Sequence, residues 1–376
     1  MEPASVLEEI RFGYGPRLGD IPAAAGIDPD RVLAQLEAED PLGRVWDRPP
    51  LRDRYALIAR YGAERQSGAA TSREVARALK QQVVDDTASF VARPAFATAG
   101  FVERLCNLWA NRITVSTAAG GVVRYVQSFR DEAVRRHIGG TYGAMLRATL
   151  WHPGMQVYLS QASSSGPDSV AGKRRRRGLN ENLAREFLEL HSMRTGYSQE
   201  DVTQLALLLA GMVSDDKGER VDPQRVQPGT KRILGRLYGD DDPKAEIDRL
   251  IADVARRPET AENVAFTLAR HFIADVPPEG LVQALAAAYQ THDGHLPALY
   301  RLLLEHPAAS DPERHKLRTP QDLAAATLRL LGLTAPAVGP GLERRCAGCL
   351  WCWAPWGSSP IAPCGRTAGP RSRRAG

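Results

Sequence analysis

The 376-residue sequence lacks any long apolar run, and only 6% of its residues are aromatic. No window of eighteen consecutive apolar residues occurs, which excludes a membrane-spanning helix. Charged residues make up 25% and hydrophobic residues 43% of the chain. These shares are typical of globular proteins and argue against disordered, collagen-like and disulfide-scaffold classes.

The first residues include acids where a signal peptide needs Lys or Arg, so we expect a soluble, cytoplasmic protein without a leader.

Residues 1–340 also lack a net charge. The formal charge of +5 comes from the tail between Gly341 and Gly376, which contains six arginines and one acid. The same tail holds four of the five cysteines and three of the six tryptophans, without hydrophobic periodicity. Because this composition does not favour a packed core, we expect residues 336–376 to be irregular.

The cysteines of the tail allow two interpretations. Their spacing resembles part of an iron–sulfur ligand set, whose thiolates would be Cys346, Cys349, Cys352 and Cys364. The other interpretation is a tail read in the wrong frame, because GC-rich back-translation and a frame shift after Arg345 can yield a sequence of ordinary composition. The segment has none of the turn chemistry that would hold a cluster. These cysteines are therefore weak metal candidates, and no cofactor is expected.

Signals for β-strands and for common catalytic motifs are scarce. The sequence has no Gly-x-Ser-x-Gly elbow, no phosphate-binding Gly-Lys-Ser/Thr loop and no Gly-x-Gly-x-x-Gly motif.

Apolar residues recur at helical spacing in segments 122–133, 247–254, 264–272, 281–289, 296–303 and 323–330. We predict an all-α fold, a multi-helix orthogonal array or bundle, with at most one short β-hairpin near residues 213–230. It forms either one helical domain over 1–335 or two sub-bundles over 1–212 and 230–335.

A helix, a tight corner and a second helix are predicted between residues 179 and 212. At 100° per residue, Leu183, Phe187 and Leu190 fall on one side of the first helix, together with Asn180 and His191. The opposite side carries polar residues, namely Glu181, Asn182, Arg185 and Glu189. After the corner, Ser198 and Asp201 have the spacing of a capping box that begins the second helix.

The sequence resembles the Domain of Unknown Function 1800 family of bacterial proteins. The central segment 178–191 and the Gly-Tyr-x-Gln-x-Asp-Val element at 196–202 match elements of that family. Further matching segments are 11–15, 28–36, 108–111, 165–169, 271–275 and 316–320. The resemblance spans most of residues 10–335 and implies no particular activity. Genes of the Domain of Unknown Function 1501 family often lie beside genes of this family, which implies a protein partner.

Three positions depart from the pattern of that family. Members usually have His where this chain has Arg112, Asp where it has Ser160, and Trp where it has Met212. If the family has a polar site built from those groups, the resemblance implies that this chain is impaired in it.

Glu186, Glu189 and His191 are candidates for a metal or acid–base site. The two carboxylates are three residues apart and can share a helix face, as in metal sites of helical bundles. His191 lies about 160° around the helix from Glu189, so a ligand from another helix would be needed. The alternative, a solvated charged face beside a hydrogen-bonded core histidine, is favoured.

A polar pocket within the bundle is the second kind of site considered. A buried amide or imidazole without a partner costs about 1–3 kcal/mol, so Asn180 and His191 either brace a neighbouring segment or line a pocket. The complete set of candidate functional or polar-pocket residues is Asn111, Asn180, Asn182, Arg185, Glu186, Glu189, His191 and His271.

A basic loop precedes the central helix and consists of Lys173, Arg174, Arg175, Arg176 and Arg177. Such a run can contact phosphates, but no aromatic interleaving or nucleic-acid motif accompanies it. With no converging catalytic constellation, the sequence favours a scaffold or partner-binding protein over an enzyme. The alternatives are a metal-assisted hydrolase that uses Glu186 or Glu189, and a nucleic-acid binder that uses the basic loop.

Overall fold

The computed structural model of the protein describes residues 3–17, 26–40, 44–68, 71–116, 122–175, 178–313 and 316–332. These residues are mainly helical, which confirms the predicted fold class. The α-helices are α1 (Pro3–Arg11), α2 (Pro29–Ala34), α4 (Leu51–Gln66), α5 (Ser72–Phe96), α6 (Gly100–Arg112), α7 (Val126–Ser128), α8 (Tyr142–Trp151), α9 (Pro153–Tyr158), α10 (Val170–Arg175), α11 (Asn182–Glu186), α12 (Gln199–Leu209), α13 (Pro243–Ala255), α14 (Pro258–Phe272), α15 (Glu279–Thr291), α16 (Leu296–Glu305) and α17 (Pro320–Leu330).

Short segments of other helix types connect or extend these α-helices. The 3₁₀ turns are η1 (Val122–Arg124), η3 (Arg135–His137), η4 (Gln161–Ser163) and η6 (Pro307–Ala309). Two segments are π-helical, η2 (Phe129–Val134) and η5 (Phe187–Ser192). A π-turn contains more residues than an α-turn, so it changes which side chains face the core after it.

Strands occur, among the described residues, in two antiparallel hairpins. β1 (Met212–Asp215) pairs with β2 (Gly218–Val221) in the region where one hairpin was predicted. β3 (Lys231–Ile233) and β4 (Arg236–Tyr238) form a second hairpin soon after it. Its turn places Leu234 and Gly235 at positive φ, the backbone that Asn-Gly usually signals. Because Leu precedes the glycine here, the sequence carried no clear signal for this second hairpin.

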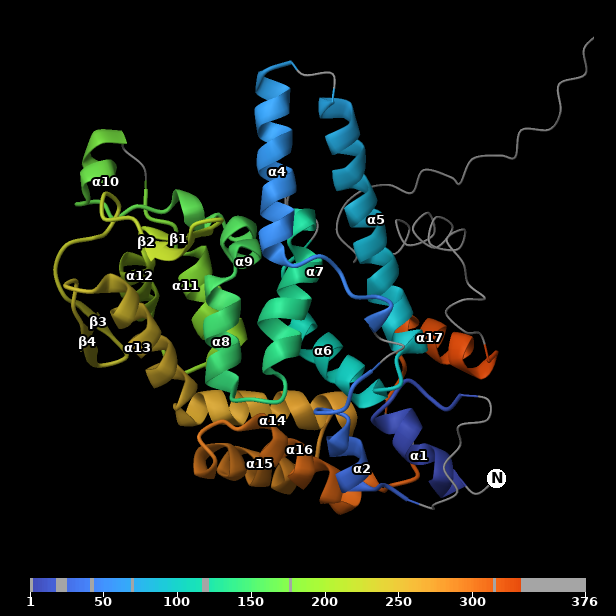
Figure 1. Ribbon diagram of the computed structural model, residues 1–376. Helices are drawn as coiled ribbons and strands as arrows, with labels where there is room; N and C mark the ends of the chain where they lie inside the picture. Colours follow the sequence, from blue (N-terminus) through green and yellow to red (C-terminus); the bar gives the residue numbers. More distant parts are fainter. Residues whose placement is uncertain are drawn as a thin grey trace, which may run out of the picture.

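The helices form an orthogonal array (Figure 1). Helices α14, α15 and α16 lie together as a base, and α8 and η2 rise steeply from it. Helices α4 and α5 form an upright antiparallel pair, the α4–α5 hairpin, whose outer end stands clear of the base. Among the helices of the described residues, none has both the length and the apolarity that crossing a membrane requires.

The hydrophobic core lies where α6, α8, α14 and α16 meet, and Trp109 is at its centre. The indole Nε1 of Trp109 donates a hydrogen bond of 3.1 Å to Tyr300 Oη. The ring of Tyr142 packs against the indole at a centroid distance of 5.1 Å. All three side chains are buried, and the hydrogen bond satisfies the indole N–H that burial would otherwise leave without a partner.

Local capping signals identified several helix ends correctly. Ser198 and Asp201 form the predicted capping box at the start of α12. Asp242 caps α13, whose buried face includes Ile247, Leu250, Ile251 and Val254, within the predicted segment 247–254. Pro258 is the first residue of α14, a position that proline favours.

Two predicted helical faces differ from the structure. Segment 122–133 has its apolar face largely buried as predicted, but it is built from η1, α7 and η2 and is not one regular α-helix. In α17 we expected Leu323 and Leu330 to face the core, yet they are 60% and 57% exposed, and Ala325 and Arg329 are buried instead. Arg329 is buried because its Nε donates a hydrogen bond of 2.7 Å to the carbonyl of Gly15.

Candidate functional site

Asn180 braces the loop that precedes the central helix. Its amide Nδ2 donates a hydrogen bond of 2.7 Å to the carbonyl of Leu159, and its Oδ1 accepts one of 3.0 Å from the backbone N–H of Asn182. The backbone N–H of Asn180 donates to Ser164 Oγ at 3.1 Å. The amide group therefore joins two loops and orients the first turn of α11.

The π-helix η5 changes the face that the sequence predicted for the end of the central helix. The backbone N–H of Met193 donates to the carbonyl of Leu188, five residues earlier, at 3.0 Å. This wider turn rotates Leu190 outward, so it is 41% exposed and not buried as expected. His191, which was predicted on the buried side, is 4% exposed.

His191 lies in a buried polar cluster with Arg112 and Asn263. Burial, and to a smaller extent the charge of Arg112, lowers the pKa of His191 to about 3. Arg112 donates a hydrogen bond of 2.9 Å to Asn263 Oδ1, and Asn263 Nδ2 donates one of 2.6 Å to the carbonyl of Ser192. Position 112, where the resembled family usually has His, therefore lies near the neutral imidazole of His191.

The other two departures from the family pattern lie elsewhere. Ser160 precedes η4 as its N-cap residue, with a φ of 56°, a left-handed conformation that Asp tolerates better than most residues. Met212 begins β1 and is buried.

The carboxylates of Glu186 and Glu189 lie near each other at the surface of the central helix. Glu189 is exposed and Glu186 is half-buried. Partial burial raises the pKa of Glu186, and the nearby charge of Glu189 raises it further. Within the described ranges, no group of three or more His, Cys, Asp and Glu side chains is placed to hold a metal ion. His191 is buried on the core side, so the three predicted residues do not converge.

Asn182 and Arg185 face outward as predicted. Asn182 is exposed, and Arg185 pairs with Glu181 at 3.2 Å, the expected i,i+4 pair. Arg185 also donates a hydrogen bond of 3.0 Å to Gln199 Oε1. Asn111 is exposed, and its carbonyl accepts a hydrogen bond from Thr114 Oγ1.

His271 lies in a second cluster, with Arg104 as its neighbour. The His271 Nε2 and an Arg104 Nη2 are 3.5 Å apart, and burial followed by the charge of Arg104 lowers the pKa of His271 well below its usual value. Arg104 also donates to the carbonyl of Gly13 at 3.2 Å, and its guanidinium lies over the rings of Tyr14 and Phe272. Segments 11–15 and 271–275 therefore meet at Arg104.

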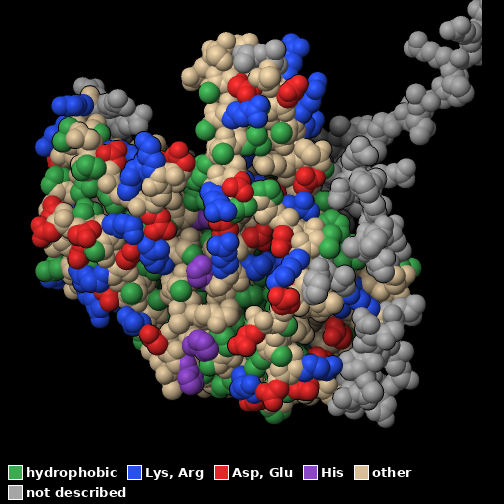
Figure 2. Space-filling model, viewed as in Figure 1, with side chains coloured by type: hydrophobic (Ala, Val, Ile, Leu, Met, Phe, Trp, Pro, Cys, Tyr) green, Lys and Arg blue, Asp and Glu red, His purple; other side chains and the backbone are tan. Residues whose placement is uncertain are grey.

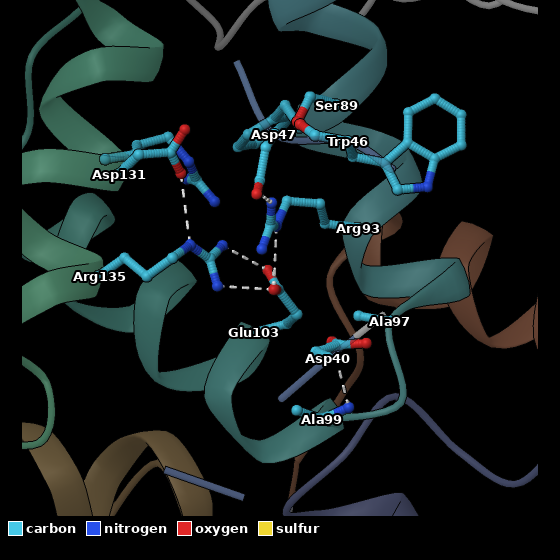
Figure 3. Close-up of polar contacts among 12 residues, drawn as sticks. Asp40, Trp46, Asp47, Ser89, Arg93, Ala97, Ala99, Glu103, Asp131 and Arg135 are labelled. Carbon is cyan, nitrogen blue, oxygen red and sulfur yellow. Dashed lines mark hydrogen bonds and ion pairs between the residues drawn. The ribbon is translucent and has the colours of Figure 1, made fainter. Parts of the chain in front are cut away.

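A buried charge network has Glu103 of α6 at its centre (Figure 3). Arg135 donates two hydrogen bonds to its carboxylate, of 2.7 and 2.8 Å, and Arg93 donates a third, of 3.1 Å. Arg93 also binds Asp47 at 2.6 Å, and Arg135 binds Asp131 at 3.3 Å. Charges of alternating sign thus join α5 and α6 to the segment before α4, which carries Asp47, and to η2 and η3, which carry Asp131 and Arg135.

Electrostatics keep the buried Glu103 ionised. Burial alone would raise the pKa of this carboxyl, but the guanidinium groups of Arg135 and Arg93 lower it below its ordinary value. The side chain of Glu103 is 1% exposed. Sequence analysis missed this group, because a Glu and an Arg in α6 look like an ordinary solvated face unless both sides of the helix are known to be buried.

A hydrogen-bonded chain extends from this network across α6. Arg130 donates to Asn107 Oδ1, and Asn107 Nδ2 donates to Tyr14 Oη. The Arg130 guanidinium also lies 4.5 Å from the ring centroid of Phe90. Burial lowers the pKa of Arg130, and burial raises that of the neighbouring Cys106 thiol to about 11. The chain joins three segments, and burial leaves the Cys106 thiol protonated near neutral pH.

The predicted basic loop is partly helical, because Lys173, Arg174 and Arg175 belong to α10. Helix α10 begins directly after Ser169, which caps its first turn. The Ser169 hydroxyl accepts a hydrogen bond of 3.0 Å from the backbone N–H of Gly172. Lys173 and Arg174 are exposed. Outside the described residues lie Arg176 and Arg177 of this run and the four tail cysteines, Cys346, Cys349, Cys352 and Cys364.

A shallow surface pocket of about 230 Å³ lies between the start of α8 and α13. Ion pairs of Arg147 with Asp248 and of Arg256 with Asp293 flank it. None of the residues predicted as candidate sites lines this pocket.

A family model described as "Protein of unknown function (DUF1800)" matches residues 9–357. The chain belongs to the DUF1800 family. The DUF1800 match covers nearly the whole chain and includes every segment that carried the resemblance. It continues past Arg345, where a frame shift was considered. No curated protein and no solved structure matched the chain.

Proposed function

We propose that the protein is a scaffold that binds another protein, and that the α4–α5 hairpin is the element it presents to that partner. The observation that carries this proposal is the projection of the hairpin from the body (Figure 1). Neither cluster of buried apolar side chains that forms the cores includes a described side chain between residues 47 and 91. The outer part of the hairpin therefore contributes little to the cores, which leaves it free for binding.

A buried ion pair joins the two helices at the base of the hairpin. Arg54 of α4 donates hydrogen bonds of 2.7 and 2.8 Å to both carboxylate oxygens of Asp86 on α5. Arg54 also donates to the carbonyls of Pro49 at 3.0 Å and Arg124 at 3.3 Å. A bidentate pair of this kind sets geometry, so the hairpin is held in a defined orientation, as a preorganised binding element requires.

The two helices pack against each other along a narrow apolar seam. Val75 and Leu79 of α5 are buried in it, while Leu57 and Ile58 of α4 are half-buried. The outward side of α4 carries exposed alanines, including Ala59 and Ala63. Small side chains on that side allow a partner to approach the helix closely.

Family resemblance supports a protein of the Domain of Unknown Function 1501 family as the partner, in the bacterial cytoplasm. Site-specific photo-cross-linking tests the proposal: a photoreactive residue replaces Ala63 in the full chain, in cells that express the native gene. We expect a discrete protein adduct at this position. The matched control is Ala287, an exposed alanine of α15. Adducts that are absent at Ala63, or equal at both positions, would overturn the proposal.

Metal-assisted hydrolysis by Glu186 or Glu189 remains the second candidate activity. The raised pKa of Glu186 beside Glu189 is the observation that favours it. Metal analysis of the purified full chain separates the two functions. The scaffold proposal expects no stoichiometric metal, whereas a bound metal that is lost in Glu186→Gln and retained in Glu200→Gln would favour the hydrolase.

A further inference from the structure

The outer half of the α4–α5 hairpin carries an excess of positive charge. Between residues 59 and 81 there are five cations and two acids. Of the acids, Glu64 is paired with Arg60 at 2.7 Å. The remaining cations are exposed, and none of them forms an ion pair with another described residue: Arg65, Arg73, Arg77 and Lys80. Figure 2 shows Lys and Arg side chains along the upper part of this column.

Three of these cations share one face of α5. Arg73, Arg77 and Lys80 have the spacing i, i+4 and i+7, which places them within a narrow sector of the helix. The row extends about 10 Å along the helix axis. Like charges at these spacings destabilise a helix, so the free protein has an unfavourable repulsion that opposite charges on a partner would remove.

We propose that this row is a docking site for an acidic helix of a partner protein, one with carboxylates at the same i, i+4 and i+7 spacing. The inference rests on the proposed scaffold function and names the chemistry of the partner that the hairpin binds. A second helix laid along α5 presents side chains at the matching period. Arg65, in the last turn of α4, adds positive charge at the outer end of the same hairpin.

Charge complementarity of this kind acts mainly on association and specificity. Because the four side chains are exposed, salt screens their interactions. Binding through this row should therefore weaken steeply as ionic strength rises. The small exposed side chain of Ala78, between Arg77 and Lys80, leaves room for the partner helix to approach.

The test measures binding of the full chain to a fluorescent helical peptide with Glu at i, i+4 and i+7. A peptide of equal composition with scrambled spacing is the first control. We expect the patterned peptide to bind more tightly, and the triple variant R73E/R77E/K80E to lose about tenfold or more in affinity. The matched control variant is R136E/R232E/R270E, which reverses three exposed cations elsewhere and should change affinity little. Circular dichroism and thermal unfolding establish that both variants fold.

Several outcomes would overturn the inference. One is equal affinity for the patterned and the scrambled peptide, and another is an equal loss of peptide affinity in the two triple variants. A third is binding of single-stranded DNA, or of phosphatidylserine vesicles, that is tighter than peptide binding and depends on the same three residues. This third result would assign the row to nucleic acid or membrane. If the adduct at Ala63 forms and survives R73E/R77E/K80E, the scaffold proposal stands while this inference fails. If no adduct forms in the unmodified chain, the scaffold proposal itself fails.

Discussion

Arg135 binds both carboxylate oxygens of Glu103 inside the protein, at 2.7 and 2.8 Å. The two residues come from different helical segments, η3 and α6, and the carboxylate is also bound by Arg93 of α5. A buried ion pair does not by itself prove stability, because desolvation opposes it. Breaking one, however, leaves an uncompensated charge in the interior, so the network makes the packing of these segments depend on one carboxylate.

Replacing Glu103 should destabilise the protein strongly. Glu103→Gln keeps the shape of the side chain but leaves the guanidinium groups of Arg93 and Arg135 without their central acceptor. We expect a loss of about 3 kcal/mol or more in the free energy of unfolding, measured by urea denaturation. Glu39→Gln removes an exposed carboxylate, paired with Arg44 at 3.0 Å, and should have no measurable effect. A loss no larger for Glu103→Gln than for Glu39→Gln would contradict this account of the network.

Stability should fall in acid because two buried histidines resist protonation. The pKa of both His152 and His191 is lowered to about 3, chiefly by burial, whereas in the unfolded chain each has a pKa near 6.5. The unfolded state therefore binds more protons below pH 6.5, and stability falls as the pH drops from about 6.5 towards 3. Each histidine should contribute a slope of about 1.4 kcal/mol per pH unit within that window.

His152→Asn tests this assignment. Asn can still cap α9, since His152 Nδ1 accepts a hydrogen bond of 3.0 Å from the N–H of Gly154, but it cannot titrate. Between about pH 4 and 6, we expect the slope of the unfolding free energy against pH to decrease by about 1.4 kcal/mol per pH unit. This decrease corresponds to one proton fewer taken up on unfolding. His292→Asn, at an exposed position, should leave the slope unchanged. An unchanged slope in His152→Asn would show that this histidine is not the group responsible.

The base of the α4–α5 hairpin should loosen when its ion pair is broken. Asp86→Asn leaves Arg54, whose side chain is 2% exposed, without its bidentate acceptor. We expect faster hydrogen–deuterium exchange throughout α4 and the facing part of α5, with unchanged exchange in α14, α15 and α16. Asp85→Asn, at the neighbouring position, is the control, because Asp85 only accepts a hydrogen bond from Gln81. Equal exchange in both variants would contradict a role for Arg54 and Asp86 in anchoring the hairpin.

The reading frame of the tail can be tested on the gene itself. We predict that sequencing the DNA across the codons for Arg344 to Cys346 reveals a missing or added base. The family match in the given frame extends past Arg345 to residue 357, so a shift at Arg345 requires that the corrected frame match the family at least as far. An uninterrupted open frame without a change in length would rule out the frame shift.

The sequence predicted what depends on near neighbours. Ser198 and Asp201 cap α12 because four consecutive residues suffice to form the box, and Asp242 caps α13 for the same reason. The buried face of α13 follows from a regular period that no other interaction interrupts. These elements need no information from distant parts of the chain.

What the sequence did not predict depends on partners far away in the chain. The outward turn of Leu190 follows from a π-turn, and helical periodicity cannot anticipate one. Arg329 is buried by a hydrogen bond to Gly15, more than three hundred positions earlier. Glu103 likewise requires Arg93 and Arg135 from two other segments. A single sequence shows that such residues are polar, but not which of them meet.

Arg11 joins the first helix to a part of the chain nearly three hundred residues later. Its guanidinium donates hydrogen bonds to the carbonyls of Ala308, Ala309, Asp311 and Glu313, at 2.8, 2.6, 2.7 and 3.2 Å. During synthesis, α1 leaves the ribosome long before these acceptors exist. Contacts between such distant residues form slowly, and chains in this state expose surfaces that aggregate. Helix α1 must therefore wait, without these neighbours, until the ribosome has added about three hundred further residues.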